Sequence, residues 1–181
     1  VESRGLGDVY KRQGYFRKVV ELVKDYPDMS WALNLSYLNL SDCFLQLNKT
    51  DSVVKYLELC QPFFEELGST TALYYIDTQK IELALQRKDF AEARRLLTMS
   101  KASPEIDADM IHIRNKYLQQ FYEETGNYRQ AYDYQKENKR LDDSIRNERI
   151  RMRTADLTLR YQQDSTFCLL YTSPSPRDST S

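Results

Sequence analysis

Few residues in this sequence are of the types that carry acid–base or nucleophilic chemistry. His112 is the single histidine, and Ile111 and Ile113 flank it in a segment with helical spacing. A histidine in such an apolar setting more often completes a core than serves as a base or a metal ligand. The sequence also lacks a glycine-rich phosphate loop, an HExxH motif and a nucleophile elbow. We therefore predict a protein that is not an enzyme and that holds no cofactor.

The cysteines and carboxylates do not indicate a metal site. Apart from Cys168 near the end of the chain, the cysteines are Cys43 and Cys60. They supply two potential ligands, whereas a structural zinc ion takes four. If the chain reverses near Lys49, Cys60 lies more than a helical turn from the residue opposite Cys43, which is too far for a disulfide. Adjacent carboxylates point in different directions around a helix, and this applies to Glu65 with Glu66 and Glu123 with Glu124. We predict two buried thiols and a solvated acidic surface.

The charge balance argues against two classes of partner. The chain has 26 Lys and Arg residues and 27 Asp and Glu residues, a formal net charge of -1. Proteins that hold nucleic acid or an anionic membrane electrostatically carry an excess of basic side chains. No run of about 18 apolar residues, the length that a membrane helix needs, is present. The predicted partner is a protein or a peptide, without nucleic acid and without a membrane segment.

Helix-breaking residues are rare through the long central part of the chain. Between residues 14 and 167, Gly and Pro occur only at Gly14, Gly68, Gly126, Pro27, Pro62 and Pro104. Apolar residues recur at helical intervals, and the alternation typical of strands is missing. This pattern predicts an all-α protein. The expected helices cover residues 15–25, 30–47, 50–67, 70–87, 89–101, 106–125 and 127–163.

A short pattern recurs where four of these helices are expected to begin. Each copy has a turn residue followed, a few positions later, by a small apolar residue, at Val19, Val53, Ala93 and Ala131. These residues are 34, 40 and 38 positions apart. Such a period is typical of helical hairpin arrays. The small residue lets two antiparallel helices approach closely, and the turn favours Gly or Asn because the backbone there is left-handed.

These positions resemble the tetratricopeptide repeat (TPR) family. One unit matches at Tyr37, Leu40, Ser41, Phe44, Val53 and Leu57, and another at Leu118, Tyr122, Tyr128, Ala131 and Tyr134. A third fits at Asp89, Phe90 and Ala93 but departs from the family pattern at Asp77, Lys80 and Ile81. The resemblance implies an α-solenoid of antiparallel helical hairpins over residues 14–135, with some helices longer than the family norm. A non-repetitive helical bundle is the alternative.

The resemblance also implies a place for a ligand, because such arrays bind along the concave surface of their first helices. Nine residues map to that surface, namely Asn39, Asp42, Gln46, Tyr75, Thr78, Glu82, Lys116, Gln120 and Glu123. Chaperone-adaptor members of the family hold a peptide C-terminal carboxylate with several basic side chains and Asn. Only Asn39 and Lys116 match that arrangement, so we expect a neutral or basic peptide, or intramolecular contacts. Ordinary solvent-facing helix surface is the alternative.

The last expected helix runs without a breaker to residue 164 and should project beyond the array as an extended helix over residues 136–167. Leu141, Ile145, Met152 and Leu159 lie on one heptad seam, which is interrupted by Glu148 and weakened by Ala155. Such spacing suits a contact between two helices, although a coiled coil needs a longer run. A homodimer through this seam and a solvated helix packed back on the last hairpin are the alternatives.

Residues 134–164 also resemble the segment that closes the repeat region in bacterial membrane-anchored regulators. In those proteins the repeats precede a long helix, a membrane span and a histidine kinase or helix-turn-helix output domain. This resemblance implies a non-catalytic protein- or peptide-binding module of a signalling protein, on the periplasmic face of the membrane. The alternatives are an intracellular, cytoplasmic repeat receptor for a signal peptide and a structural scaffold.

Both ends of the chain resemble translated sequencing adapter. SRGLGDVYKRQ, at residues 3–13, and CLLYTSPSPRD, at residues 168–178, are translations of the two strands of one adapter sequence. Segments of this origin do not belong to a fold. We therefore expect residues 1–13 and 168–181 to be disordered and residues 14–167 to come from a longer gene. Without a preceding partner helix, Phe16, Val19, Val20 and Val23 should be exposed.

Overall fold

The computed structural model describes residues 2–99 and 102–145, and this part of the chain is helical without strands. The elements are α1 (Glu2–Val23), η1 (Pro27–Met29), α2 (Ser30–Gln46), α3 (Thr50–Leu67), α4 (Thr70–Gln86), α5 (Phe90–Met99), α6 (Ala108–Glu124) and α7 (Tyr128–Ile145). The prediction of an all-α protein is confirmed. The bounds of α2 to α6 also agree with the predicted ranges to within a few residues.

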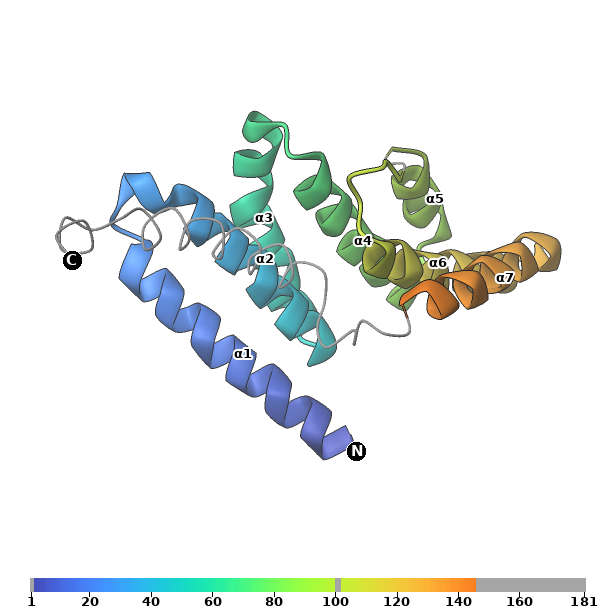
Figure 1. Ribbon diagram of the computed structural model, residues 1–181, viewed down its shortest axis with the longest axis horizontal. Coiled ribbons are helices and arrows are strands. Elements are labelled where there is room, and N and C mark those ends of the chain that lie inside the picture. The colour runs from blue at the N-terminus through green and yellow to red at the C-terminus, as the bar shows by residue number, and fades with distance from the viewer. Residues whose placement is uncertain (1, 100–101, 146–181) are drawn as a thin grey trace, which may run out of the picture.

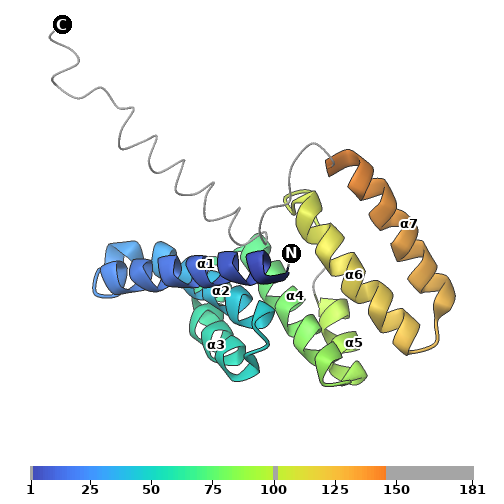
Figure 2. The ribbon, with the colours of Figure 1, turned by 90° about the horizontal axis from the view of Figure 1, so that it is seen from below.

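The helices follow one another along the longest axis of the molecule, from α1 and α2 at one end to α6 and α7 at the other (Figure 1). Neighbours in the chain pack as pairs, α1 on α2, α2 on α3, α4 on α5 and α6 on α7. The pairs are joined laterally because α4 contacts both α2 and α6. The view from below shows the same progression (Figure 2). Helices α2, α4 and α6 therefore lie in a row, and their partners flank them.

The three turns within the hairpins α2–α3, α4–α5 and α6–α7 share one backbone geometry. Each contains a single left-handed residue, Asn48, Lys88 or Gly126, with φ of 57°, 58° and 82°. The next amide donates a hydrogen bond to the carbonyl five residues earlier, from Lys49 to Phe44 (2.9 Å), from Asp89 to Ala84 (2.8 Å) and from Asn127 to Tyr122 (2.8 Å). This geometry satisfies the last carbonyls of the first helix, and it confirms the predicted turns at these positions.

The residues after these turns also repeat. The Asp89 carboxylate accepts a hydrogen bond from the Glu92 amide (3.1 Å), and the Asn127 side chain accepts one from the Gln130 amide (3.3 Å). Such side chains satisfy free amides at a helix start. Five positions after each left-handed residue, Val53, Ala93 and Ala131 are buried, as predicted.

An aromatic pair recurs between the helices of the first and third hairpins. Phe44 on α2 stacks on Tyr56 on α3, with ring centroids 5.5 Å apart and an interplanar angle of 8°. Tyr122 on α6 stacks on Tyr134 on α7 in the same way, at 5.8 Å and 4°. In the middle hairpin the equivalent residues are Ala84 and Leu96, which are both buried. The three hairpins thus bring equivalent positions of their two helices together, and the second hairpin has smaller side chains at these positions.

Two apolar clusters form the core. The larger one joins α1, α2, α3 and α4 and extends to Met110 on α6, and the smaller one joins α4, α5 and α6 around Phe121. Trp31 packs against the larger cluster with its ring edge-on to the ring of Phe64, and the two ring centroids are 5.5 Å apart. Each large apolar side chain that is fully buried contributes about 1.5–3 kcal/mol relative to an exposed one. The clusters meet along α4, which is therefore the central helix of the described chain.

Helix α1 differs from the sequence prediction. It begins at Glu2 and continues through Gly14, so the predicted disorder of residues 1–13 is wrong for residues 2–13. The predicted exposure of its apolar residues is also wrong, because Phe16 and Val23 are buried and Val19 and Val20 are half-buried. The reason is that Val9 and Gln13 continue the same helical face and pack with it against α2. Residues 168–181 lie outside the described residues, and the adapter origin of either end stays a prediction.

Two glycine substitutions test these assignments with opposite expected signs. At Gly126 the positive φ strains any side chain, so Gly126→Ala should lower the unfolding free energy by about 1 kcal/mol. Gly14 lies inside α1, and a Cβ there meets nothing within 4 Å, so Gly14→Ala should raise it by about 0.5–1 kcal/mol. Urea denaturation measures both. A loss of stability at Gly14 would contradict a continuous α1.

Candidate functional site

The nine predicted binding residues lie on α2, α4 and α6, the three helices of the central row. The structure buries Asn39, Asp42, Tyr75 and Thr78, leaves Gln46, Glu82 and Gln120 half-buried, and exposes Lys116 and Glu123. The predicted ligand surface along α2 and α4 is therefore wrong at the four buried positions. The residues on α6 remain accessible to a partner.

On α2, Asp42 is buried because α1 packs over it. Its carboxylate lies 3.2 Å from the Arg12 guanidinium and also accepts a hydrogen bond of 2.9 Å from Gln46. Asn39 donates a hydrogen bond of 2.9 Å to the Leu35 carbonyl of its own helix. These side chains are thus engaged in intramolecular contacts, which was one of the alternatives expected for this surface.

Polar contacts join α2 to α4 inside the molecule. Ser41 on α2 donates a hydrogen bond of 2.6 Å to the side-chain oxygen of Gln79 on α4. The Gln79 amide group in turn lies 3.5 Å from the Leu38 carbonyl, at the outer limit of a hydrogen bond. Both side chains are buried. Because a buried polar group is costly without a partner, these contacts fix how the two helices sit against each other.

A buried arginine makes the corresponding connection between α4 and α6. The Arg114 guanidinium donates hydrogen bonds to Thr78 Oγ1 (2.9 Å) and to the Tyr74 carbonyl (2.7 Å). It also lies over the Tyr74 ring, 3.4 Å from the centroid. Burial lowers the pKa of Arg114 and raises the pKa of Tyr74, while their proximity opposes both shifts. A second contact nearby is the hydrogen bond from the Tyr117 hydroxyl to Glu82.

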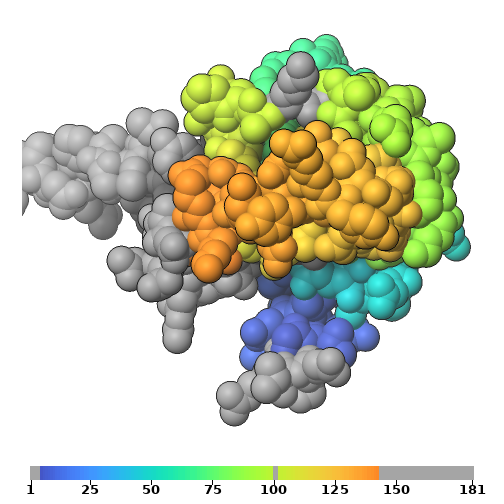
Figure 3. Space-filling view, turned by 90° about the vertical axis from the view of Figure 1, so that its right-hand side faces the viewer, coloured from blue at the N-terminus to red at the C-terminus, as the bar shows by residue number. Residues whose placement is uncertain are grey.

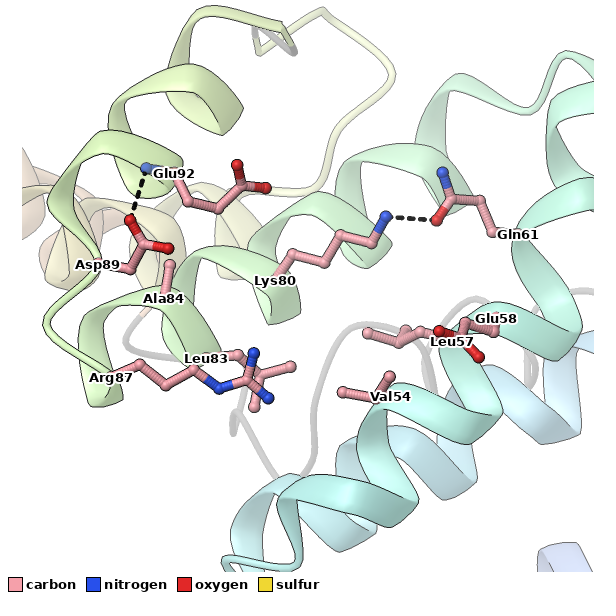
Figure 4. A pocket seen from close by; sticks show the side chains of 10 residues that line it. All are labelled: Val54, Leu57, Glu58, Gln61, Lys80, Leu83, Ala84, Arg87, Asp89 and Glu92. Atoms are coloured by element: carbon pink, nitrogen blue, oxygen red, sulfur yellow. Dashed lines mark hydrogen bonds between the residues drawn. The ribbon is translucent and has the colours of Figure 1, made fainter.

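A small cleft of about 220 Å³ lies between α3, α4 and α5 (Figure 4). Apolar side chains form one part of its lining, and Gln61 and ionisable groups of both signs form the rest, as the labelled residues show. Lys80 is held by a hydrogen bond of 2.5 Å to Gln61, across the cleft from Asp89 and Glu92 at the start of α5. The volume matches about one large side chain, and the lining does not favour one charge.

A larger, open cleft of about 570 Å³ lies between α6 and α7, and we call it the α6–α7 cleft. Its described lining is His112, Lys116, Gln119, Tyr132, Gln135, Lys136, Asn138, Lys139 and Asp142. Lys116, one of the predicted binding residues, is part of this lining. Three lysines and one carboxylate give it a positive formal balance.

The residues whose side chains could carry chemistry, His112, Cys43 and Cys60, are all buried in the packed interior. His112 is buried, and its Nε2 lies 2.6 Å from the Asp142 carboxylate on α7. Cys43 and Cys60 are buried free thiols, as predicted. Burial raises the pKa of Cys60 to about 12, so this side chain is a neutral thiol at physiological pH. Among the described residues, no three His, Cys, Asp or Glu side chains are grouped as metal ligands would be.

The predicted dimerisation seam is described only in part. Leu141 is buried within the chain, so it is not available for a second copy in this conformation. Ile145 is the last residue of α7, and Met152 and Leu159 lie outside the described residues. The alternative of a helix packed back on the last hairpin agrees with the part of α7 that is described, because α7 packs along α6.

Two buried polar residues, Arg114 and Asn138, are missing from the predicted site residues. For Arg114 the signal is its position, since it lies at a helical interval from Met110 and Phe121, which are both buried. A charged residue on an apolar stripe indicates a buried partner. Asn138 is buried at 7% exposure, and nothing in the sequence around it distinguishes it from the exposed polar residues of α7.

None of the helices in the described ranges combines the length and the apolar composition that a membrane span requires. Comparisons of the chain with protein-family models, with curated proteins and with solved structures found no match. Functional inference therefore rests on the residues and the geometry of this chain.

Replacing the buried arginine tests the contact between α4 and α6. Arg114→Met keeps much of the side-chain volume but removes the hydrogen bonds to Thr78 and Tyr74, so we expect a loss of about 2 kcal/mol in unfolding free energy. Exposed Arg129 on α7 is the matched control, and Arg129→Met should leave stability unchanged within error. Thermal and urea denaturation measure both. Equal stability of the two variants would show that the guanidinium contributes nothing to the contact between these helices.

Proposed function

We propose that this chain is a non-catalytic protein-interaction module built from TPR-like hairpins. The observation that carries the proposal is the repeated turn at Asn48, Lys88 and Gly126, which has the same backbone geometry in three successive hairpins. The shared aromatic stack in the first and third hairpins and the row of α2, α4 and α6 support it further. Arrays of this kind bind partners along extended surfaces.

The accessible part of the row sets where a partner binds. Lys116, Gln120 and Glu123 lie on α6 and remain partly or fully exposed, whereas the equivalent surface of α2 is covered by α1. A peptide or protein segment therefore binds at the α6 end of the row. The resemblance of residues 134–164 to the closing segment of membrane-anchored regulators favours a role in signalling, and the part of that segment beyond residue 145 lies outside the described residues.

Selection from a phage-displayed library of random peptides tests the proposal. The full chain should enrich a defined set of sequences, and Lys116→Glu should weaken their binding at least about threefold because it reverses a charge at the α6 end of the row. Lys18→Glu, at an exposed position on α1, is the control with the same change of charge. Titration calorimetry with the enriched peptides measures the affinities.

Two outcomes would contradict the proposed function. One is a selection without enrichment over an unrelated helical protein. The other is saturable stabilisation by a nucleotide, a metal ion or a metabolite in a thermal-shift screen, followed by turnover of that compound, because this would indicate an enzyme.

A further inference from the structure

We infer that the α6–α7 cleft binds an acidic peptide segment, with lysines at its rim pairing with the carboxylates of the peptide. This inference rests on the proposed function and names the chemistry of the partner. The cleft lies at the end of the molecule where α7 is the outermost helix, and Figure 3 views that end face-on. Its volume of about 570 Å³ lies within the range of known ligand sites.

Asn138, one of the residues that line the cleft, ties α7 to α6. The amide nitrogen donates a hydrogen bond of 3.0 Å to the His112 carbonyl, and this contact fixes which end of the side chain is the donor. The carbonyl oxygen, Oδ1, is buried and accepts no hydrogen bond from the described residues. Because Oδ1 is enclosed by the protein, Asn138 joins the two helices of the cleft and does not contact a ligand.

The charges along the cleft indicate the chemistry of its partner. Lys116 on α6 and Lys136 and Lys139 on α7 are exposed and line the same cleft. Lys136 Nζ lies over the ring of Tyr132, 5.0 Å from its centroid, and Tyr132 is 58% exposed. Exposed tyrosines are enriched at protein interfaces. Carboxylates on the partner would complement this rim.

The acidic groups near the cleft help to choose between classes of ligand. The Asp142 carboxylate lies against His112 (2.6 Å), and Asp133 lies 3.8 Å from Lys136. A nucleic acid places a negative charge at every phosphate, so it could not avoid these carboxylates along its backbone. A peptide can place its carboxylates opposite the lysines and neutral residues opposite Asp133 and Asp142. The observations therefore favour a peptide with a few separated acidic residues.

Fluorescence anisotropy with the full chain tests this inference. The probes are three labelled peptides of equal length in which alanine alternates with glutamate, glutamine or lysine. The glutamate peptide should bind at least about tenfold more tightly than the glutamine peptide at low salt, and this preference should shrink as salt screens the charges. The lysine peptide should not bind. A single-stranded oligonucleotide is included as a fourth probe.

Charge-reversal variants locate the binding. Lys136→Glu combined with Lys139→Glu should raise the Kd for the glutamate peptide at least about tenfold, because it reverses the charge of the rim. Lys18→Glu combined with Lys55→Glu changes the net charge equally at exposed positions on α1 and α3 and should leave the Kd unchanged. Circular dichroism confirms that each variant is folded.

Three results would overturn the inference. They are equal binding of the glutamate and glutamine peptides, equal loss of affinity in the two double variants, and tighter binding of the oligonucleotide than of the glutamate peptide. Any of these would leave the proposed function intact if library peptides still bind on the α6 row. If the library selection enriches no peptide and the glutamate peptide does not bind, both the proposed function and this inference are rejected.

Discussion

Each of the three hairpins depends on one residue in the left-handed backbone conformation between its two helices. At Asn48, Lys88 and Gly126 this residue reverses the chain and closes the same backbone hydrogen bond. The small residue five positions later is thereby brought against the first helix, and the aromatic pair further along meets its partner in register. Lys88 adopts this conformation without the advantage of Gly or Asn, at a cost of about 1–2 kcal/mol. Packing of Ala93 and Leu96 offsets that cost.

The lateral contacts between hairpins are of a different kind, because they bury polar groups. Ser41 meets Gln79 between α2 and α4, and Arg114 meets Thr78 between α4 and α6. Hydrogen bonds between buried groups are directional, so they fix the offset of neighbouring helices more narrowly than apolar packing does. The same contacts use side chains that would otherwise face a ligand. Of the nine residues predicted to bind a ligand, the two that are fully exposed, Lys116 and Glu123, lie on α6.

The positions of the helices could be predicted from the sequence, but which helix packs on each of their faces could not. Scarce breakers and the turn pattern place α2 to α6 because helix ends are local properties of the chain. Helical spacing also places Asn39 and Asp42 on one face with Gln46, but it does not show which helix packs on that face. Helix α1 begins before residue 14 because Val9 and Gln13 extend its buried face, and the expected origin of residues 3–13 gives no information about packing. Burial of Asn138 depends on contacts between α6 and α7 that no local pattern contains.

A map of the backbone amide resonances that shift when the glutamate–alanine peptide is added to isotope-labelled protein tests the account most directly. It reports at once whether the chain binds a peptide and where. We predict saturable shifts concentrated on α6 and α7 around Lys116 and Asn138, with α1 and α3 unaffected. Shifts centred on α1, α2 or α3, or a spectrum that does not change, would contradict the account.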